Sequence, residues 1–182
     1  LLQWENRYSV GIEAVDHVVN ANVLWYLGER PETQPVIAFL NEIVAAERER
    51  DHAWYYVGEI ALYHAIARAY RAGARSLVPA RERIARRLTS RQSESGSFGT
   101  ALATALGVLT LLHLEVDDGR AARSLVGHLL AQQGEEGGFS RAAYFMGPFA
   151  PAPRSVWFGS EELTTALALE ALVRYRIATS AA

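Results

Sequence analysis

The chain contains no cysteine and no lysine. Without cysteine it cannot build a disulfide framework, a thiol nucleophile or a thiolate metal site. All 18 basic residues are therefore arginine, and this usage, together with abundant alanine, is typical of a GC-rich bacterial genome. The formal net charge of −2 lacks the basic excess by which proteins bind nucleic acids. The five histidines show no paired zinc-ligand spacing, so neither a metal nor another cofactor is expected.

Long apolar runs are also missing. No run reaches the ~18 residues expected of a membrane span, and no signal peptide is visible. We therefore expect a cytoplasmic protein, whose oligomeric state stays open. A length of 182 residues, half of them hydrophobic, suits one compact domain over residues 1–182. Because the first residue is Leu rather than Met, we expect a processed product or a fragment, and we interpret the domain as lacking upstream helices or as a truncated or open version of a larger fold.

Apolar residues at helical spacing predict an all-α fold of seven helices, and no alternating pattern of useful length predicts strands. In the first helix the apolar residues at this spacing are Val19, Val23, Tyr26 and Leu27, with Asp16 as its N-cap. The charged run 47–51 is expected to lie in solvent at the end of the second helix. The predicted ranges are 16–27, 35–50, 55–72, 77–90, 100–114, 120–132 and 160–175.

The predicted helices alternate in character. The second, fourth and sixth are amphipathic, whereas the others are apolar or rich in small residues and read as buried. This alternation predicts antiparallel pairs, each with an outer, solvated helix and an inner, buried one. Such pairs, repeated side by side, curve into an α-solenoid or close into an α/α toroid.

An internal repeat supports the stacked arrangement. Gln92-x-x-x-Gly96-x-Phe98 returns 41 residues later as Gln133-x-x-x-Gly137-x-Phe139, each copy leading toward an apolar helix. The helices after the two copies also correspond, because residues 102–106 (Leu-Ala-Thr-Ala-Leu) match residues 163–167 (Leu-Thr-Thr-Ala-Leu). A fixed period of this kind indicates repeated supersecondary units. We expect the Gln to tie helix ends and Phe98 to pack between layers.

The motif and its position resemble the QW motif of terpenoid cyclases and protein prenyltransferases, with Phe where the motif often has Trp. A degenerate earlier copy is Arg48-x-x-x-His52-x-Trp54. The resemblance spans about residues 14–177 and implies part of an (α/α)6 toroid around an apolar cavity. The family's chemistry lacks its residues here: the cyclase Asp-x-Asp-Asp acid is reduced to Asp16 at the corresponding helix start, and the prenyltransferase zinc site needs a cysteine.

The candidate site residues lie near the expected starts of the inner helices or in the aromatic, proline-rich loop after the second motif copy. Glu59 is the first candidate for catalysis, because a carboxylate on an otherwise apolar helix must be paired or protonated; a structural hydrogen bond to a neighbouring Tyr is the alternative. Asp16 is the second, with helix capping as the favoured interpretation. The candidates for substrate binding are Asn20, Trp54, Tyr56, Tyr63, Tyr144, Trp157 and Glu161.

Three functions are compatible with these features. The first is a terpenoid cyclase or prenyltransferase-like protein that binds an isoprenoid or another apolar substrate in a central cavity. The second is a non-catalytic toroid that binds an apolar ligand or a partner, favoured by the missing acid and metal motifs. The third is a toroid glycosidase or lyase, which would need two inward carboxylates about 5 to 10 Å apart.

Overall fold

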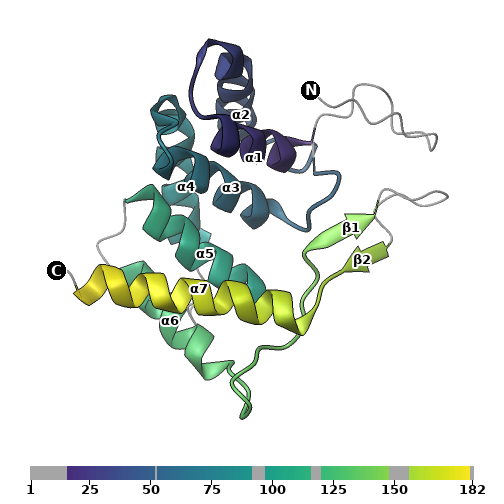
Figure 1. Ribbon diagram of the computed structural model, residues 1–182, viewed down its shortest axis with the longest axis vertical. Helices are drawn as coiled ribbons and strands as arrows, with labels where there is room; N and C mark the ends of the chain where they lie inside the picture. Colours follow the sequence, from purple (N-terminus) through teal and green to yellow (C-terminus); the bar gives the residue numbers. More distant parts are fainter. Residues whose placement is uncertain (1–15, 52, 92–96, 116–119, 148–155, 181–182) are drawn as a thin grey trace.

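The computed structural model describes residues 16–51, 53–91, 97–115, 120–147 and 156–180. Within these ranges the chain is mostly helical, which confirms the all-α prediction (Figure 1). The described elements are α1 (His17–Leu27), the 3-10 turn η1 (Pro31–Thr33), α2 (Gln34–Ala46), α3 (Glu59–Arg71), the 3-10 turn η2 (Arg75–Leu77), α4 (Val78–Arg91), α5 (Ala101–Leu114), α6 (Arg120–Ala131), β1 (Phe145–Gly147), β2 (Val156–Phe158) and α7 (Glu161–Ser180).

The helices form two layers. In the inner layer α1, α3, α5 and α7 lie in a row, each packed along its length against the next, and all four begin on the side of the β-hairpin (Figure 1). The helices α2, α4 and α6 cover one side of this row. The helices therefore alternate along the chain between the row and its cover, but only α3 and α5 of the helices expected to be buried are mostly buried, whereas α1 and α7 are largely exposed. Among the described residues α1 and α7 make no extensive contact, so the row is open, and its closure into a toroid stays a prediction.

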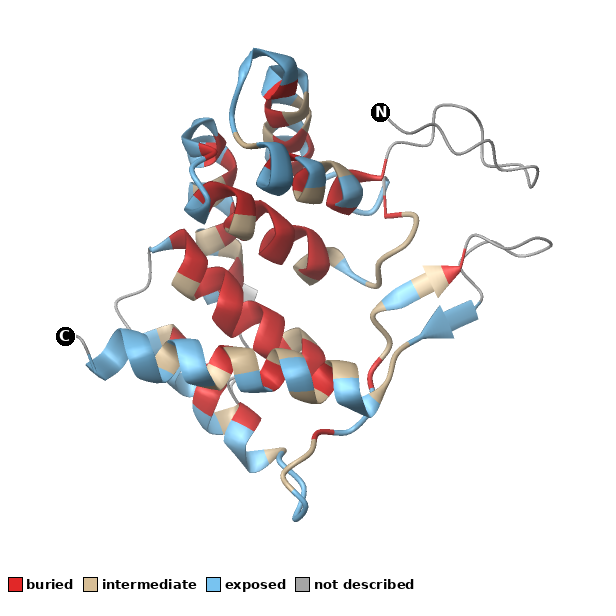
Figure 2. Cartoon of the chain, viewed as in Figure 1, coloured by how far each residue is buried: buried red, intermediate tan, exposed pale blue. Residues whose placement is uncertain are grey.

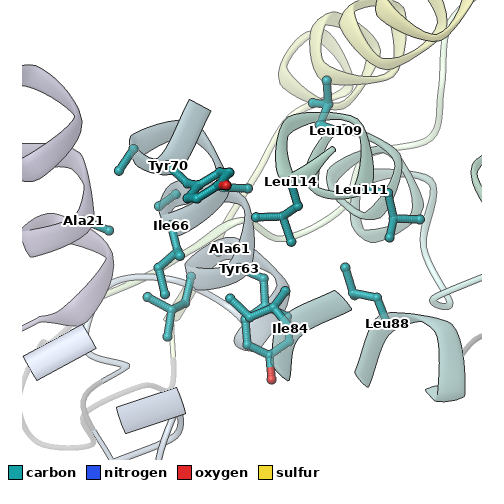
Figure 3. Packing of buried hydrophobic residues seen from close by; sticks show 14 of the residues in the cluster. Ala21, Ala61, Tyr63, Ile66, Tyr70, Ile84, Leu88, Leu109, Leu111 and Leu114 are labelled. Carbon is teal, nitrogen blue, oxygen red and sulfur yellow. The ribbon is translucent and has the colours of Figure 1, made fainter. Parts of the chain in front are cut away.

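The core lies between the layers and is centred on α3 and α5. Nearly every residue of α5 is buried, as expected for a helix that is apolar on all sides (Figure 2). Side chains from α3, α4 and α5 meet in one cluster, in which Tyr63 of α3 lies beside Ile84 of α4 (Figure 3). This cluster joins the outer layer to the inner one.

The apolar residues that predict α1 lie on its exposed side. Val19, Val23, Tyr26 and Leu27 are all exposed, whereas the buried residues are His17, Val18, Ala21 and Leu24. Both sides of α1 are apolar, so periodicity alone cannot tell which of them packs against α2 and α3. The helix therefore presents an uncovered apolar face at one end of the row.

The second helix is shorter than predicted. It ends at Ala46 because Glu47 takes a left-handed conformation (φ 57°), and the N–H of Arg48 turns back to the carbonyl of Ile43 at 3.1 Å. The prediction that the whole charged run 47–51 is solvated is wrong, because Glu49 is buried. The start of α3 also differs: residues 55–57 pair with the β-hairpin, and the helix begins at Glu59 rather than at Tyr55.

The two motif copies are structurally equivalent at their aromatic residue. The N–H of Phe98 donates to the hydroxyl of Thr104 at 3.3 Å, and the N–H of Phe139 donates to the hydroxyl of Thr165 at 3.0 Å. Thr104 and Thr165 occupy the same place in the matching segments 102–106 and 163–167. The sequence repeat is therefore a structural repeat, in which each motif aromatic is fastened to the helix that follows it.

The glutamine of the motif acts differently from the prediction. Gln133 donates from Nε2 to the carbonyl of Gly137 at 2.8 Å, which closes its own turn rather than tying two helices together. Gly137 takes a positive φ of 81° in this turn. Gln92 lies outside the described residues. Phe98 does pack between elements, because its ring lies against Gly107 of α5, where a Cβ would approach Cε2 to 2.5 Å.

Candidate functional site

A pocket of about 610 Å³ opens where α3 and α5 begin. Its wall comes from the first turns of these two helices, from α4, from the chain just before α3 and α5, from residues 141–144 and from β2. Most of the wall is apolar or aromatic. The charged residues on it are Arg50, Glu59, Arg87 and Arg141. This volume is typical of sites for small organic molecules.

The β-hairpin holds one side of the pocket in place. Val57 donates its N–H to the carbonyl of Tyr144 at 2.9 Å, and Met146 donates its N–H to the carbonyl of Tyr55 at the same distance. On the other side, β2 pairs with β1, with Trp157 opposite Met146. The segment before α3, β1 and β2 therefore form one small antiparallel unit that carries Tyr144 and Trp157 to the pocket.

Gly159 allows this unit to approach the segment that follows the second motif copy. A Cβ at Gly159 would lie 1.8 Å from the carbonyl oxygen of Ala142 and 3.0 Å from the Cα of Ala143. Both alanines belong to the pocket wall. Only glycine fits this crossing of two backbones, and the crossing fixes the course of the wall.

A polar cluster joins two residues of the wall, Tyr63 and Arg87, to the buried Glu49. Tyr63 donates its hydroxyl to Oε1 of Glu49 at 3.0 Å, Arg87 forms an ion pair with the same oxygen, and Arg87 Nη2 also donates to the carbonyl of Val44 at 2.7 Å. Burial raises the pKa of Tyr63, so its hydroxyl stays protonated and remains a donor to Glu49. The cluster links the end of α2 to α3 and α4, and it neutralises Arg87, leaving Arg50 and Arg141 as the cations of the pocket.

Those two arginines have no ion-pair partner among the described residues, and both are exposed. Glu59, in the first turn of α3, is the single carboxylate among the described residues of the wall. Besides Arg87, the described lining therefore carries two cationic side chains and one carboxylate. Such a balance favours an acidic group on a ligand.

Four predicted site residues line the pocket. They are Glu59 and Tyr63 from α3, Tyr144 from the segment before β1, and Trp157 from β2. Burial raises the pKa of Tyr144 to about 12, so its phenol is neutral at ordinary pH and offers a hydroxyl without charge. Tyr144 is steadied by Tyr56, whose ring meets it edge-on at 5.3 Å between centroids.

The other predicted residues lie outside the described lining. Asp16 caps α1: one carboxylate oxygen accepts from Val19 N–H at 2.9 Å, and the other accepts from the N–H groups of Trp54 and Tyr55 at 2.9 and 3.1 Å. Asn20 donates to the carbonyl of Asp16 at 2.8 Å, so it belongs to the same cap. Glu161 is exposed in the first turn of α7. Trp54 is held to the Asp16 cap through its backbone, and Tyr56 contacts the wall through the ring of Tyr144.

The three arginines of the lining were not predicted from the sequence, and Phe98, which was expected only to pack between layers, also lines the pocket. Arg50 and Arg87 belong to segments that read as solvated, and no pattern marks which arginine of a charged face turns inward. The signal for Arg141 was its position: it stands two residues after Phe139, at the start of the aromatic loop. A polar residue next to the motif was the available clue.

A second group of titratable side chains lies away from the pocket. The rings of His64 in α3 and His113 in α5 stack with centroids 5.9 Å apart, and both side chains are buried. Burial lowers the pKa of His64 to about 3 and that of His113 to about 4, and the positive charge of Arg174 on α7 adds to both shifts. Both rings are therefore neutral at ordinary pH.

No protein-family model and no curated protein matches this chain. Within the described residues no helix is both long and apolar enough to cross a membrane. The same residues contain no group of three or more side chains arranged to hold a metal ion. The geometry of the pocket therefore carries the functional argument.

Proposed function

We propose that the pocket binds an isoprenoid or another apolar small molecule that ends in an acidic group, as a terpenoid cyclase or prenyltransferase-like protein. The observation that carries this proposal is an apolar and aromatic pocket of about 610 Å³ whose lining includes Arg50 and Arg141, two arginines without an ion-pair partner in the described part of the chain. An apolar wall favours a hydrocarbon body because burial removes it from water. Arginine favours a phosphate or carboxylate end because its planar guanidinium donates in pairs.

The aromatic side chains suit an unsaturated chain. Phe98, Tyr144 and Trp157 reach the pocket from three separate segments, so a bound molecule would contact ring faces and edges on several sides. Such contacts add to the free energy of simple area burial. Phe98 therefore has two roles, because it contacts α5 and also forms part of the pocket wall.

Glu59 is the candidate acid or base of any reaction in this pocket, because it is the single carboxylate of the described lining. Asp16 is better placed as a structural cap, since both of its oxygens accept backbone hydrogen bonds. A glycosidase or lyase would draw on two facing carboxylates, and the described lining offers one. That alternative has the least support.

A non-catalytic ligand-binding module is the second candidate function. It is favoured because the described lining offers no second carboxylate that could share a proton with Glu59 or raise its pKa, as a general acid requires. Glu59→Gln distinguishes the enzyme from the ligand-binding module. Retained binding with abolished turnover of a bound isoprenoid assigns catalysis to Glu59, whereas retained binding with no turnover in either protein assigns binding alone.

Binding is tested by isothermal titration with linear isoprenoid alcohols and with their diphosphates. Ala103 faces the pocket from α5, so Ala103→Trp fills the hollow and is expected to abolish binding of both ligands. Ala45→Trp is the matched control, because Ala45 is exposed on α2 and lies outside the wall. Equal affinity in wild type and Ala103→Trp, or no binding of any apolar ligand, would overturn the proposal.

The proposed contact with the acidic end of the ligand is tested by substituting the two arginines. Arg50→Gln and Arg141→Gln are each expected to weaken diphosphate binding about tenfold, since each removes a charge-assisted hydrogen bond, and to leave alcohol binding nearly unchanged. Arg86→Gln is the control, because Arg86 is exposed on α4 outside the wall. Loss of alcohol binding to the same degree would show that the substitutions disturb the pocket rather than a charge contact.

A further inference from the structure

One face of α7 is apolar and uncovered. Leu169, Val173 and Ile177 recur at a spacing of four residues and are 59, 37 and 62 % exposed. They lie opposite the residues that pack α7 against the rest of the molecule, which are Thr164, Ala168 and Ala171. We call the three exposed residues, with Ala166 beside them, the α7 stripe. In Figure 2 much of α7 is coloured as exposed, while α5 beside it is largely buried.

The internal repeat indicates how unusual this exposure is. Residues 102–106 of α5 match residues 163–167 of α7, so Leu169 corresponds to Val108 and Val173 corresponds to Leu112. Val108 is fully buried, and Leu112 is partly buried. The same positions of the repeat are thus covered in α5 and open in α7. A contiguous apolar face of this kind on a helix marks a contact surface.

Charged residues at the two ends of the α7 stripe indicate which partner covers it. Glu162 lies seven residues before Leu169, and Arg176 lies seven residues after it. Both are exposed and lie on the same side of the helix as the stripe, about 10.5 Å from Leu169 along the axis. Among the described residues Arg176 has no ion-pair partner, whereas Arg174 pairs with Glu170 within the helix at 2.7 Å.

This arrangement is self-complementary when two α7 helices run antiparallel. A two-fold axis at Leu169 sets Glu162 of one copy opposite Arg176 of the other, twice, with Leu169 on Leu169 at the centre. Parallel pairing would instead set Glu162 against Glu162. We propose that two copies of this chain form a dimer through the α7 stripe, antiparallel about a two-fold axis at Leu169. Such isologous dimers are the commonest oligomers.

Charge reversal tests the arrangement by sedimentation equilibrium. The wild-type chain is expected to dimerise, and Glu162→Arg and Arg176→Glu are each expected to raise the dimer dissociation constant about tenfold by turning two attractions into repulsions. An equimolar mixture of the two variants is expected to regain the wild-type constant, because each heterodimer then carries two opposite-charge pairs. Glu82→Arg and Arg123→Glu, on the exposed sides of α4 and α6, are the matched controls.

Leu169→Glu removes the centre of the stripe and is expected to give a monomer with an unchanged circular dichroism spectrum, since the side chain is exposed in the monomer. The absence of cysteine permits a direct cross-linking test. Leu169→Cys is expected to form a disulfide-linked dimer on oxidation. A mixture of Leu169→Cys with Val23→Cys tests the competing arrangement, in which α7 of one copy covers α1 of the next.

The proposal is overturned by a monomeric wild-type chain at high micromolar concentration, by a dimer that Leu169→Glu leaves intact, or by mixed variants that stay dissociated. Preferential cross-linking between positions 169 and 23 would also overturn it, in favour of an open chain of copies. None of these measurements involves the pocket, so the dimer and the proposed ligand can fail independently.

Discussion

The two copies of the repeat make the same anchor and then diverge. After Phe98 the chain enters α5 within three residues. After Phe139, by contrast, about twenty residues (140–160), which we call the detour, precede α7. The detour contains Arg141, Tyr144 and Trp157, which all line the pocket. The first copy contributes Phe98 and the start of α5 to the lining, and the second contributes the segment with these three residues. The site is therefore built where the repeat is interrupted, on a scaffold that the repeat provides.

The two copies also differ in what covers them. The helix α5 lies between α3 and α7 and is buried on all sides, whereas α7 ends the row and leaves the α7 stripe open. Position 113 of α5 holds a buried, neutral histidine, and the matching position 174 of α7 holds an exposed arginine. The same repeat position therefore tolerates a charge only where no further helix of the row covers it.

The largest effect is expected at Gly159, the crossing point of the detour. Gly159→Ala would press a methyl group into the backbone at Ala142, which no side-chain movement can relieve. We expect a loss of about 3 kcal/mol in the free energy of unfolding, together with loss of ligand binding. Urea denaturation measures the first and calorimetric titration the second.

Gly127→Ala is the matched control for Gly159, because it lies in α6 with no atom within 4 Å of the added carbon. It is expected to raise stability by up to about 1 kcal/mol through helix propensity. A Gly159→Ala protein as stable as wild type would contradict the view that this crossing shapes the pocket wall.

Acid is expected to destabilise the chain through His64 and His113. Their pKa values in the folded state, about 3 and about 4, lie below the ordinary value near 6.5 of an unfolded chain. Between these pH values the unfolded state therefore binds more protons than the folded state. The two histidines leave the free energy of unfolding unreduced above about pH 6.5 and lower it as the pH falls toward 4. The loss is on the order of 2 kcal/mol for each histidine by pH 5.

The measurement is the unfolding free energy as a function of pH for wild type and His64→Phe. The variant keeps a ring against His113 but does not titrate, so its stability should fall about half as steeply between pH 6.5 and 5. An identical pH profile in the two proteins would remove the histidine pair from the explanation.

Gly107→Ala tests the contact between the first motif copy and α5. The added carbon would overlap the ring of Phe98, which must then shift, and Phe98 also lines the pocket. We expect a net loss of about 1 to 2 kcal/mol in stability, because the overlap outweighs the gain of about 1 kcal/mol in helix propensity. Gly107→Ala with Phe98→Leu should recover stability, as measured by denaturation. No recovery would mean that the added methyl group clashes with a different neighbour.

The smallest effects are expected at the two equivalent anchors. Thr104→Val leaves the N–H of Phe98 without its acceptor, and Thr165→Val does the same to Phe139. Each is expected to lower the free energy of unfolding by about 1 kcal/mol. Thr110→Val is the control, because that hydroxyl donates to a carbonyl within α5 and its loss should be nearly neutral. If only one of the two anchors proved sensitive, the copies would not be equivalent in energy.

The sequence was sufficient for the helices and their layers because periodicity and burial have the same physical cause. It failed at α1, where both faces are apolar and Val19 and Val23 prove to be on the open one. It missed the strands because Phe145–Gly147 and Val156–Phe158 are too short for alternation to appear. Their pairing depends on residues 55–57, far away in the chain.

The pocket was predictable only in part. Glu59, Tyr63, Tyr144 and Trp157 were found because helix starts and aromatic loops gather at one end of such a fold. The arginines were missed because a charged face gives no sign of which side chain turns inward. Glu49 illustrates this, since it is buried by a hydrogen bond and an ion pair with residues 14 and 38 positions away.

The most direct test of the account is the fluorescence of Trp157 during titration with a linear isoprenoid diphosphate. Trp157 stands on the detour and lines the pocket, so ligand binding is expected to change the protein's tryptophan fluorescence. Trp157→Phe is expected to bind the ligand, as seen by calorimetry, with most of that change gone. A full fluorescence change in Trp157→Phe would place the ligand elsewhere, and the absence of binding to the wild-type chain would contradict the proposed function itself.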